Sequence, residues 1–287
     1  MKPWHKHQLD AIGTRWSIET STALHADELN KINSTIEDFD KAYSRFRSDS
    51  LVSIMRDTGE SQVFPHSITD ILGVYKKLHD VTDGAVNPLV GGSLESLGYD
   101  ANYSLKSRGA QPAPPFSQLL CNRTSVTLPA GSLLDIGAAG KGYLTDQIAR
   151  VVAKKHSSYV IDASGDIAVH ANQAEVIGLE HPLYVNRVIG AVQLSRHSLC
   201  ASAPNRRKWS DELHHILDAR TGLPAHGDIV ATWAIADTTF LADALSTGLF
   251  FVSYQDLQNV FGDFYYVIMN REGSVRHNID SIGEIYT

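Results

Sequence analysis

The chain has 287 residues, of which 43% are hydrophobic and 20% are charged, and its formal net charge is −7 at pH 7. This length and composition are typical of a folded globular protein with a substantial core, and they exclude an intrinsically disordered chain. The negative charge argues against a nucleic-acid-binding surface. Any anionic ligand must therefore be held by local donors or by a metal ion.

The sequence contains no segment that resembles a membrane span, since no apolar run approaches the roughly 20 residues required. The first sixteen residues, MKPWHKHQLDAIGTRW, lack the apolar core and cleavage site of a signal peptide. As written, the sequence predicts a cytoplasmic protein, or a periplasmic one if an export signal was trimmed from it. Cys121 and Cys200 match no metal-ligand spacing, and we expect both to be packing residues.

In the first half of the chain, residues 12–20 alternate between apolar and polar side chains, which predicts a β-strand. In residues 26–46 the apolar side chains recur with a period near 3.6, which predicts a helix. Its apolar face consists of Leu29, Ile32, Ile36, Phe39 and Ala42. A second helix is expected over residues 67–82, with Ser67 or Thr69 as its N-cap.

The stretch from 104 to 116 is rich in proline and small residues, and we predict a loop there. The segments after it are interpreted as strands in 125–137, a helix from about Gly142, strand, turn and strand in 157–171, one strand in 190–203, two strands around a turn in 214–236, and helices in 238–261. Strands predominate and helices come in blocks. We therefore predict one α+β domain over residues 1–287, in which loop 104–116 divides two closely packed halves.

The segment LLDIGAAGKGYLTDQIARVV, residues 133–152, places Lys141 among three glycines at the expected start of a helix. Gly137, Gly140 and Gly142 would let a ligand approach the main chain, and the first amides of the helix would then face it, as in phosphate sites. The spacing is neither that of a Walker loop nor that of a dinucleotide fingerprint. The alternative is a tightly packed turn with Lys141 in solvent.

A second group of polar residues follows in HHILDARTGLPAHG, residues 214–227, and in LADALSTGLF, where Asp243 and Thr247 are four residues apart. Residues at this spacing share one face of a helix, so a carboxylate and a hydroxyl would converge there. Hard oxygen ligands of this kind suit Mg²⁺. The alternative for Asp243 is a surface or capping acid, and for His215 a hydrogen-bonded structural histidine.

Four segments, residues 135–152, 159–171, 214–227 and 242–251, resemble in order and spacing the ApbE family, the FAD:protein FMN transferases. In the first half, residues 12–20, 43–56 and 83–92 are similar to that family's first strand, flavin loop and ligand-contacting turn. This resemblance implies an α+β fold of internally duplicated appearance with a central FAD cleft. It also implies Mg²⁺-dependent transfer of FMN from FAD to a threonine or serine hydroxyl of an acceptor flavoprotein, with release of AMP.

The resemblance also assigns roles to individual residues. Asp135 and Lys141 would contact FAD, while the main-chain oxygen of Ala138 would bind the metal together with Asp243 and Thr247. The flavin or adenine pocket would be lined by Ile12, Phe46, Ala85, Val86 and Asn87. His215 would border the FAD and is the first candidate for the general base, with Asp243 as the second.

Two departures from the family pattern concern the ligand pocket. Asn87 stands where the family frequently has aspartate, and Phe46 where it frequently has tyrosine. Both can still contact a ligand, by hydrogen bonding and by stacking respectively. Two other functions stay open: an FAD pyrophosphatase that gives FMN and AMP without an acceptor, and a non-catalytic FAD-binding protein.

Overall fold

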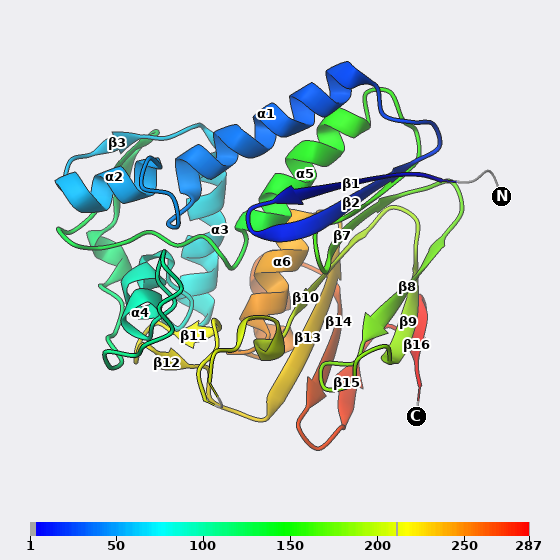
Figure 1. The fold of residues 1–287 in the computed structure, drawn as a ribbon. Helices are drawn as coiled ribbons and strands as arrows, with labels where there is room; N and C mark the ends of the chain where they lie inside the picture. Colours follow the sequence, from blue (N-terminus) through cyan, green and yellow to red (C-terminus); the bar gives the residue numbers. More distant parts are fainter. Residues whose placement is uncertain (1–3, 211, 287) are drawn as a thin grey trace.

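The protein, seen in a computed structural model that describes residues 4–210 and 212–286, is built on one large antiparallel sheet (Figure 1). Eight strands form it in the order β1-β2-β6-β7-β10-β13-β14-β15, and every neighbouring pair is antiparallel. The strands are β1 (His5–Ala11), β2 (Thr14–Thr20), β6 (Tyr159–Asp162), β7 (Asp166–His170), β10 (Ser198–Ser202), β13 (Ile229–Ala236), β14 (Tyr265–Asn270) and β15 (Val275–His277).

One face of this sheet is covered by helices α1 (Ala26–Tyr43), α5 (Gly140–Val152) and α6 (Thr239–Gly248) (Figure 1). The apolar stripe predicted for α1 is real, because Ile32 packs with Ile148 of α5 and Ile18 of β2 in a buried cluster. Helix α6 packs against β10 and β13 in a second cluster. The fold therefore brings α5 and α6 together above the middle of the sheet.

The opposite face is covered by a three-stranded sheet made of β16 (Gly283–Ile285), β9 (Val188–Leu194) and β8 (Glu175–Glu180). Strand β13 demonstrates the two-sided packing, since its residues alternate between the two cores. Trp233 and Ile235 belong to the cluster with β8 and β9, whereas Ala234 and Ala236 belong to the cluster with α6. This alternation follows from the period of two along a strand.

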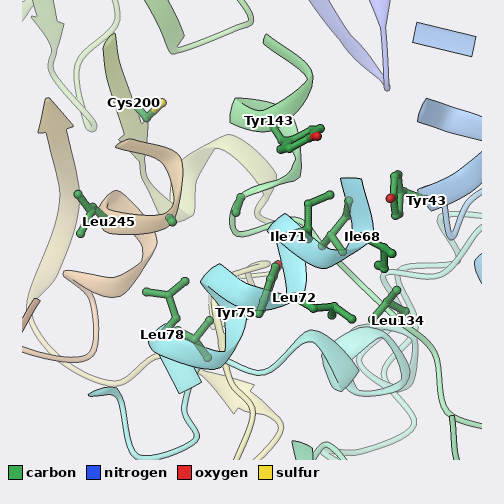
Figure 2. Packing of buried hydrophobic residues seen from close by; sticks show 14 of the residues in the cluster. Tyr43, Ile68, Ile71, Leu72, Tyr75, Leu78, Leu134, Tyr143, Cys200 and Leu245 are labelled. Atoms are coloured by element: carbon green, nitrogen blue, oxygen red, sulfur yellow. The ribbon is translucent and has the colours of Figure 1, made fainter. Parts of the chain in front are cut away.

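Helix α3 (Ser67–Val81) is the centre of the helical part that flanks the sheet. Its face of Ile68, Ile71, Leu72, Tyr75 and Leu78 is buried (Figure 2). The same part of the molecule contains α2 (Leu51–Thr58), α4 (Gly91–Ser96), α7 (Tyr254–Phe261), the sheet β3 (Gln62–Val63), β5 (Ser125–Thr127) and β4 (Leu120–Asn122), the hairpin β11 (Leu217–Asp218) and β12 (Leu223–Pro224), and the 3-10 turns η1 (Pro88–Val90) and η2 (Phe116–Gln118). A third 3-10 turn, η3 (Pro204–Arg207), follows β10 and contacts the end of β8.

The predicted α+β class and the helices expected in 26–46, 67–82 and 238–261 are confirmed. The single strand expected over 190–203 is wrong, because a turn at 195–197 separates β9 from β10 and sends them to different sheets. Residues 214–236 contain a short hairpin followed by the separate strand β13. Residues 132–137, expected to contain a strand, have no regular structure, and the helix expected from about Gly142 begins at Gly140.

The expected N-cap of α3 is also wrong. The cap position is His66, which makes no side-chain capping bond. The hydroxyl of Ser67 is instead 2.6 Å from the Tyr43 hydroxyl, and the Thr69 hydroxyl donates to the main-chain oxygen of His66. Of the two cysteines expected in the core, Cys200 is buried but Cys121 is exposed.

Membrane insertion by a helix finds no support in the part of the chain that the structure describes. None of the helices there combines the length and the apolar character needed to cross a bilayer.

Candidate functional site

The junction of α5 and α6 joins two of the polar motifs. Asp243 lies in the middle of α6, is 5% exposed, and accepts a hydrogen bond of 2.9 Å from the backbone amide of Gly142 in the first turn of α5. The α5 amide and the partial positive charge of the helix start both stabilise a carboxylate there. Asp243 is therefore neither a surface acid nor a cap of its own helix.

Lys141 is held by the turn between β6 and β7. Its ammonium donates hydrogen bonds to the main-chain oxygens of Ala163 (2.9 Å) and Ser164 (3.1 Å), and it lies 3.4 Å from Oδ2 of Asp166. Asp166 is buried, and within the described residues this Oδ2 atom has no hydrogen-bond partner. Lys141 is thus not the solvated lysine that the alternative interpretation of its motif requires.

The junction carries more negative than positive charge in a place that water barely reaches. Burial raises the pKa of Asp243 well above its ordinary value, and the charge of Asp166 raises it further, whereas Lys141 lowers it. Burial likewise raises the pKa of Asp166, against the opposing effect of Lys141. Two buried carboxylates thus share one ammonium, and a bound cation would relieve their repulsion.

The residues predicted to bind Mg²⁺ lie on α6 and just before α5. Asp243 and Thr247 are one turn apart on α6, as expected, and Ala138 lies two residues before the start of α5. Across the described ranges, no three His, Cys, Asp or Glu side chains come together as a metal site. An ion here would therefore be held by one carboxylate, neutral oxygens and water, which is an arrangement that Mg²⁺ accepts.

None of the three glycines of this segment has a positive φ, and two of them lie in close packing contacts rather than beside open space. A Cβ atom at Gly142 would lie 2.3 Å from the main-chain oxygen of Thr239 in α6. A Cβ atom at Gly140 would collide with the side chain of Ile136. Gly140 and Gly142 are therefore needed for close packing, and the amide of Gly142 is already bonded to Asp243.

His215 lies in the segment that precedes β11. An antiparallel bridge between Lys208 and His214 places Arg207 opposite His215. Burial lowers the pKa of His215 to about 3, and the charges of Arg207 and Lys141 contribute to this shift. Its Nδ1 atom is buried without a hydrogen-bond partner in the described structure. His215 is therefore a neutral imidazole with one ring nitrogen unused.

Asp135 is committed to contacts within the protein. One of its oxygens forms a 2.7 Å ion pair with Arg45, whose side chain is 2% exposed, and the other accepts the amide of Gly137. The hydroxyl of Tyr75 accepts the neighbouring amide of Ala138 at 3.0 Å. Asp135 and Asp243 both raise the pKa of Tyr75, after the larger effect of burial. Tyr75 therefore lies within reach of the charges of both Asp135 and Asp243.

Phe46 belongs to a cluster of aromatic rings beside Arg45. The Arg45 guanidinium is 4.2 Å from the centre of the Phe46 ring. Tyr103 stacks on Phe46 at 5.4 Å, and Trp209 stacks on Tyr99 at 5.3 Å. These rings form an aromatic cluster next to the segment that carries Arg207.

The turn at residues 85–87 is brought close to the other motifs through its backbone. The oxygen of Ala85 accepts the amide of Ala219, and Val86 is buried, as is Ala85. The side-chain Nδ2 of Asn87 donates to the main-chain oxygen of Pro114, and its Oδ1 accepts from the backbone amide of Leu89. The backbone of Ala85 therefore links this buried turn to the segment that follows β11.

Ile12 lies in the first hairpin of the large sheet. It occupies the tight turn between β1 and β2 with φ of 43°, a strained value for a β-branched residue, and it packs on the cluster shared by α5 and β2. Strained residues of this kind are frequent at ligand sites.

Several residues of the site were not found from the sequence, namely Asp166, Arg207, Arg45 and Tyr75. Each acts through a contact between segments that are distant in sequence, such as the pair of Arg45 with Asp135. Asp166 would have been the easiest of them to predict, because it begins the second strand of the predicted strand–turn–strand segment, directly after Ser164 and Gly165.

Comparison with known proteins places these motifs in one family. The ApbE family matches residues 12–264 of the chain. The FAD:protein FMN transferase of Escherichia coli (strain K12) is 24% identical over 302 residues, which cover 96% of this chain and 84% of that protein.

Solved structures have the same fold. The ApbE protein of Thermotoga maritima superposes with a TM-score of 0.82 at 23% identity, covering 96% of this chain and 97% of that one. The flavin transferase ApbE of Vibrio cholerae superposes with a TM-score of 0.75 at 16% identity, covering 99% and 97%. The similarity therefore extends over nearly the whole chain.

Proposed function

The chain belongs to the ApbE family and is a transferase; on this premise we propose that it moves FMN from FAD to a threonine or serine hydroxyl of an acceptor flavoprotein and releases AMP. The reaction requires a group that binds a pyrophosphate, a cation that offsets its charge and a base for the hydroxyl. The junction of α5 and α6 offers candidates for the pyrophosphate contact and for the ligands of the cation, and His215 is a candidate for the base.

The observation that carries this proposal is the buried charge at the junction. Asp243 and Asp166 are buried, the Lys141 side chain is 19% exposed, and one carboxylate oxygen has no hydrogen-bond partner among the described atoms. A protein that needed this region only for stability would gain more from apolar residues, because burying charged groups is costly. Two buried carboxyl groups with a single nearby ammonium instead suit a site that takes up a cation together with its substrate.

Asp243, Thr247 and the main-chain oxygen of Ala138 would hold Mg²⁺. Bound there, the ion would neutralise charge that develops on the departing AMP phosphate. Lys141 and Arg207 would contact the phosphate oxygens and offset the same negative charge. Because both side chains would already be in place, they would not have to move during the reaction. The ring cluster around Phe46 and Tyr99 would exclude water and hold a planar part of FAD.

His215 is our candidate for the base that takes the proton of the acceptor hydroxyl. Its ring is neutral at pH 7, and the unused Nδ1 atom can accept a proton. Its low pKa belongs to the ligand-free site, where burial and Arg207 oppose protonation. The negative charge of a bound pyrophosphate would raise this pKa toward the range in which a histidine is an effective base.

The test is to incubate the protein with FAD, Mg²⁺ and a candidate acceptor flavoprotein, and to look for flavin fluorescence on the acceptor in a denaturing gel. We expect a fluorescent acceptor band that requires both Mg²⁺ and FAD. AMP release with no labelled acceptor would instead support the pyrophosphatase. Bound FAD that stays intact with Mg²⁺ would support a flavin-binding protein.

A further inference from the structure

The hairpin of β8 and β9 ends in a loop, residues 181–187, that we call the tip. The amide of His181 donates to the oxygen of Arg187 at 2.8 Å and closes it. Three consecutive apolar side chains of the tip face solvent, with Leu183 and Tyr184 each 56% exposed and Val185 89% exposed. Hairpin loops normally present turn-forming polar residues, so this display of apolar surface calls for a functional reason.

The tip is held in a defined conformation. The His181 ring lies 4.6 Å from the Tyr184 ring, and the Arg187 guanidinium lies 5.4 Å from the centre of that ring. The amide of Leu183 donates to Nδ1 of His181. A loop that is already ordered loses little entropy when a partner binds to it, and its apolar side chains are therefore available at small cost.

Contacts with η3 place the tip beside the candidate active site. The side-chain amide of Asn205 donates to the main-chain oxygen of Pro182, and Arg206 pairs with Glu180 at the end of β8. The next residue, Arg207, ends η3 and lies opposite His215. A molecule bound at the tip would thus be connected to the proposed base, His215, through the short segment η3.

The charge and the backbone of this region indicate an extended acidic and apolar polypeptide as the partner. Glu180 is paired, whereas Arg187 and Arg207 have no carboxylate partner among the described residues. Strand β8 is the edge strand of its sheet (Figure 1), and in the described part of the chain only β9 pairs with it. An open edge is recognised by another polypeptide backbone and offers nothing specific to a lipid surface.

We propose that the tip and the outer edge of β8 form the docking surface for the acceptor protein, and that the segment bearing the reactive hydroxyl binds there in extended form. This inference rests on the proposed flavin transfer. The acceptor segment would place apolar side chains on Leu183, Tyr184 and Val185 and acidic side chains near Arg187 and Arg207. Its hydroxyl would then lie at His215.

The test uses two synthetic peptides of equal length with one central threonine. The first has leucine, valine and aspartate around it, and the second has serine, glycine and lysine at the same positions. The initial rate of covalent flavin transfer from FAD is measured for the wild type, for the Leu183→Ser, Val185→Ser double variant, and for Val63→Ser. Val63 is an exposed valine (69%) on the separate sheet of β3, β5 and β4, and it provides the matched control.

We expect the wild type to prefer the first peptide, and the double variant to raise its KM about tenfold, the loss typical of exposed apolar contacts at an interface. The FAD affinity and kcat should not change, and Val63→Ser should behave as the wild type. A double variant with an unchanged KM and unchanged peptide preference would overturn the docking surface.

Two further outcomes contradict the inference in different ways. Binding of the wild type to phosphatidylcholine and phosphatidylglycerol vesicles that the double variant loses, with peptide KM unaffected, would assign the tip to a membrane surface. A wild type that binds FAD and Mg²⁺ but labels neither peptide nor any folded flavoprotein would refute the transfer itself, and the docking surface with it.

Discussion

The junction of α5 and α6 and the tip of the β8–β9 hairpin are both chemically incomplete, but in opposite ways. At the junction, polar groups are buried and one carboxylate oxygen of Asp166 has no partner in the described structure. At the tip, apolar side chains such as Val185 face water. Each arrangement costs free energy that an isolated folded chain does not recover. The first arrangement suits a small charged ligand, and the second suits a macromolecule.

Asp243→Asn should have the largest effect at the junction. Asparagine keeps the size and the acceptor for the Gly142 amide, but it removes the charge that would hold Mg²⁺. We expect turnover to fall by about 10²- to 10³-fold, as for the loss of a main electrostatic group. The melting temperature and FAD affinity should change little, and excess Mg²⁺ should recover part of the rate. A variant that turns over normally at limiting Mg²⁺ would remove Asp243 from the metal site.

Gly142→Ala tests whether the junction depends on close helix packing. The new Cβ atom would meet the oxygen of Thr239 at 2.3 Å and Cβ of Asp243 at 2.7 Å, so α5 and α6 must separate. We expect the free energy of unfolding to fall by about 3 kcal/mol in chemical denaturation. Gly73→Ala in α3 is the control, because nothing lies within 4 Å of its Cβ position. Equal stability of the two variants would contradict the packing role.

Lys141→Met tests the shared charge at the junction. Removal of the ammonium leaves Asp166 buried beside Asp243 without compensation, and we expect a loss of about 2–4 kcal/mol in the free energy of unfolding. The Lys141→Met, Asp166→Asn double variant should recover most of this stability but none of the turnover. Additive losses in the double variant would show that the two side chains do not act as a pair.

The pH dependence of stability gives a smaller effect. The pKa of His215 is lowered to about 3, so the unfolded chain takes up a proton below about pH 6.5 that the folded chain excludes. Above that pH the neutral His215 costs no stability, and the free energy of unfolding decreases as the pH falls below it. At pH 5 this residue should cost about 2 kcal/mol. Denaturation between pH 7.5 and 5 should show a shallower loss for His215→Gln, and the wild-type slope for His5→Gln on the exposed start of β1.

Much of the fold could be predicted because it depends on local patterns. The period of the apolar residues in α1 and the spacing of Asp243 and Thr247 in α6 both follow from helix geometry, which depends on residues that are close in sequence. The break between β9 and β10 could not be found, since the turn at 195–197 contains neither glycine nor proline. Sequence also shows where a Cβ atom is missing, but not what occupies the space, and Gly142 faces a helix rather than a ligand.

The tip and the buried charges at the junction could not be predicted for a related reason. Leu183, Tyr184 and Val185 are apolar residues in the sequence, and only the fold shows that they are exposed. Asp166 and Arg207 reach the site across strands and turns that are far apart in the chain. Their importance comes from what surrounds them in three dimensions.

The most direct measurement follows both halves of FAD in one reaction. With FAD labelled in the adenine ring, Mg²⁺ and an acceptor flavoprotein, AMP is quantified by chromatography and flavin on the denatured acceptor by absorbance. We predict one AMP for each covalently bound flavin, no AMP without Mg²⁺, and loss of both products in Asp243→Asn. AMP formed in the absence of acceptor at the same rate, with free FMN and no labelled protein, would contradict flavin transfer.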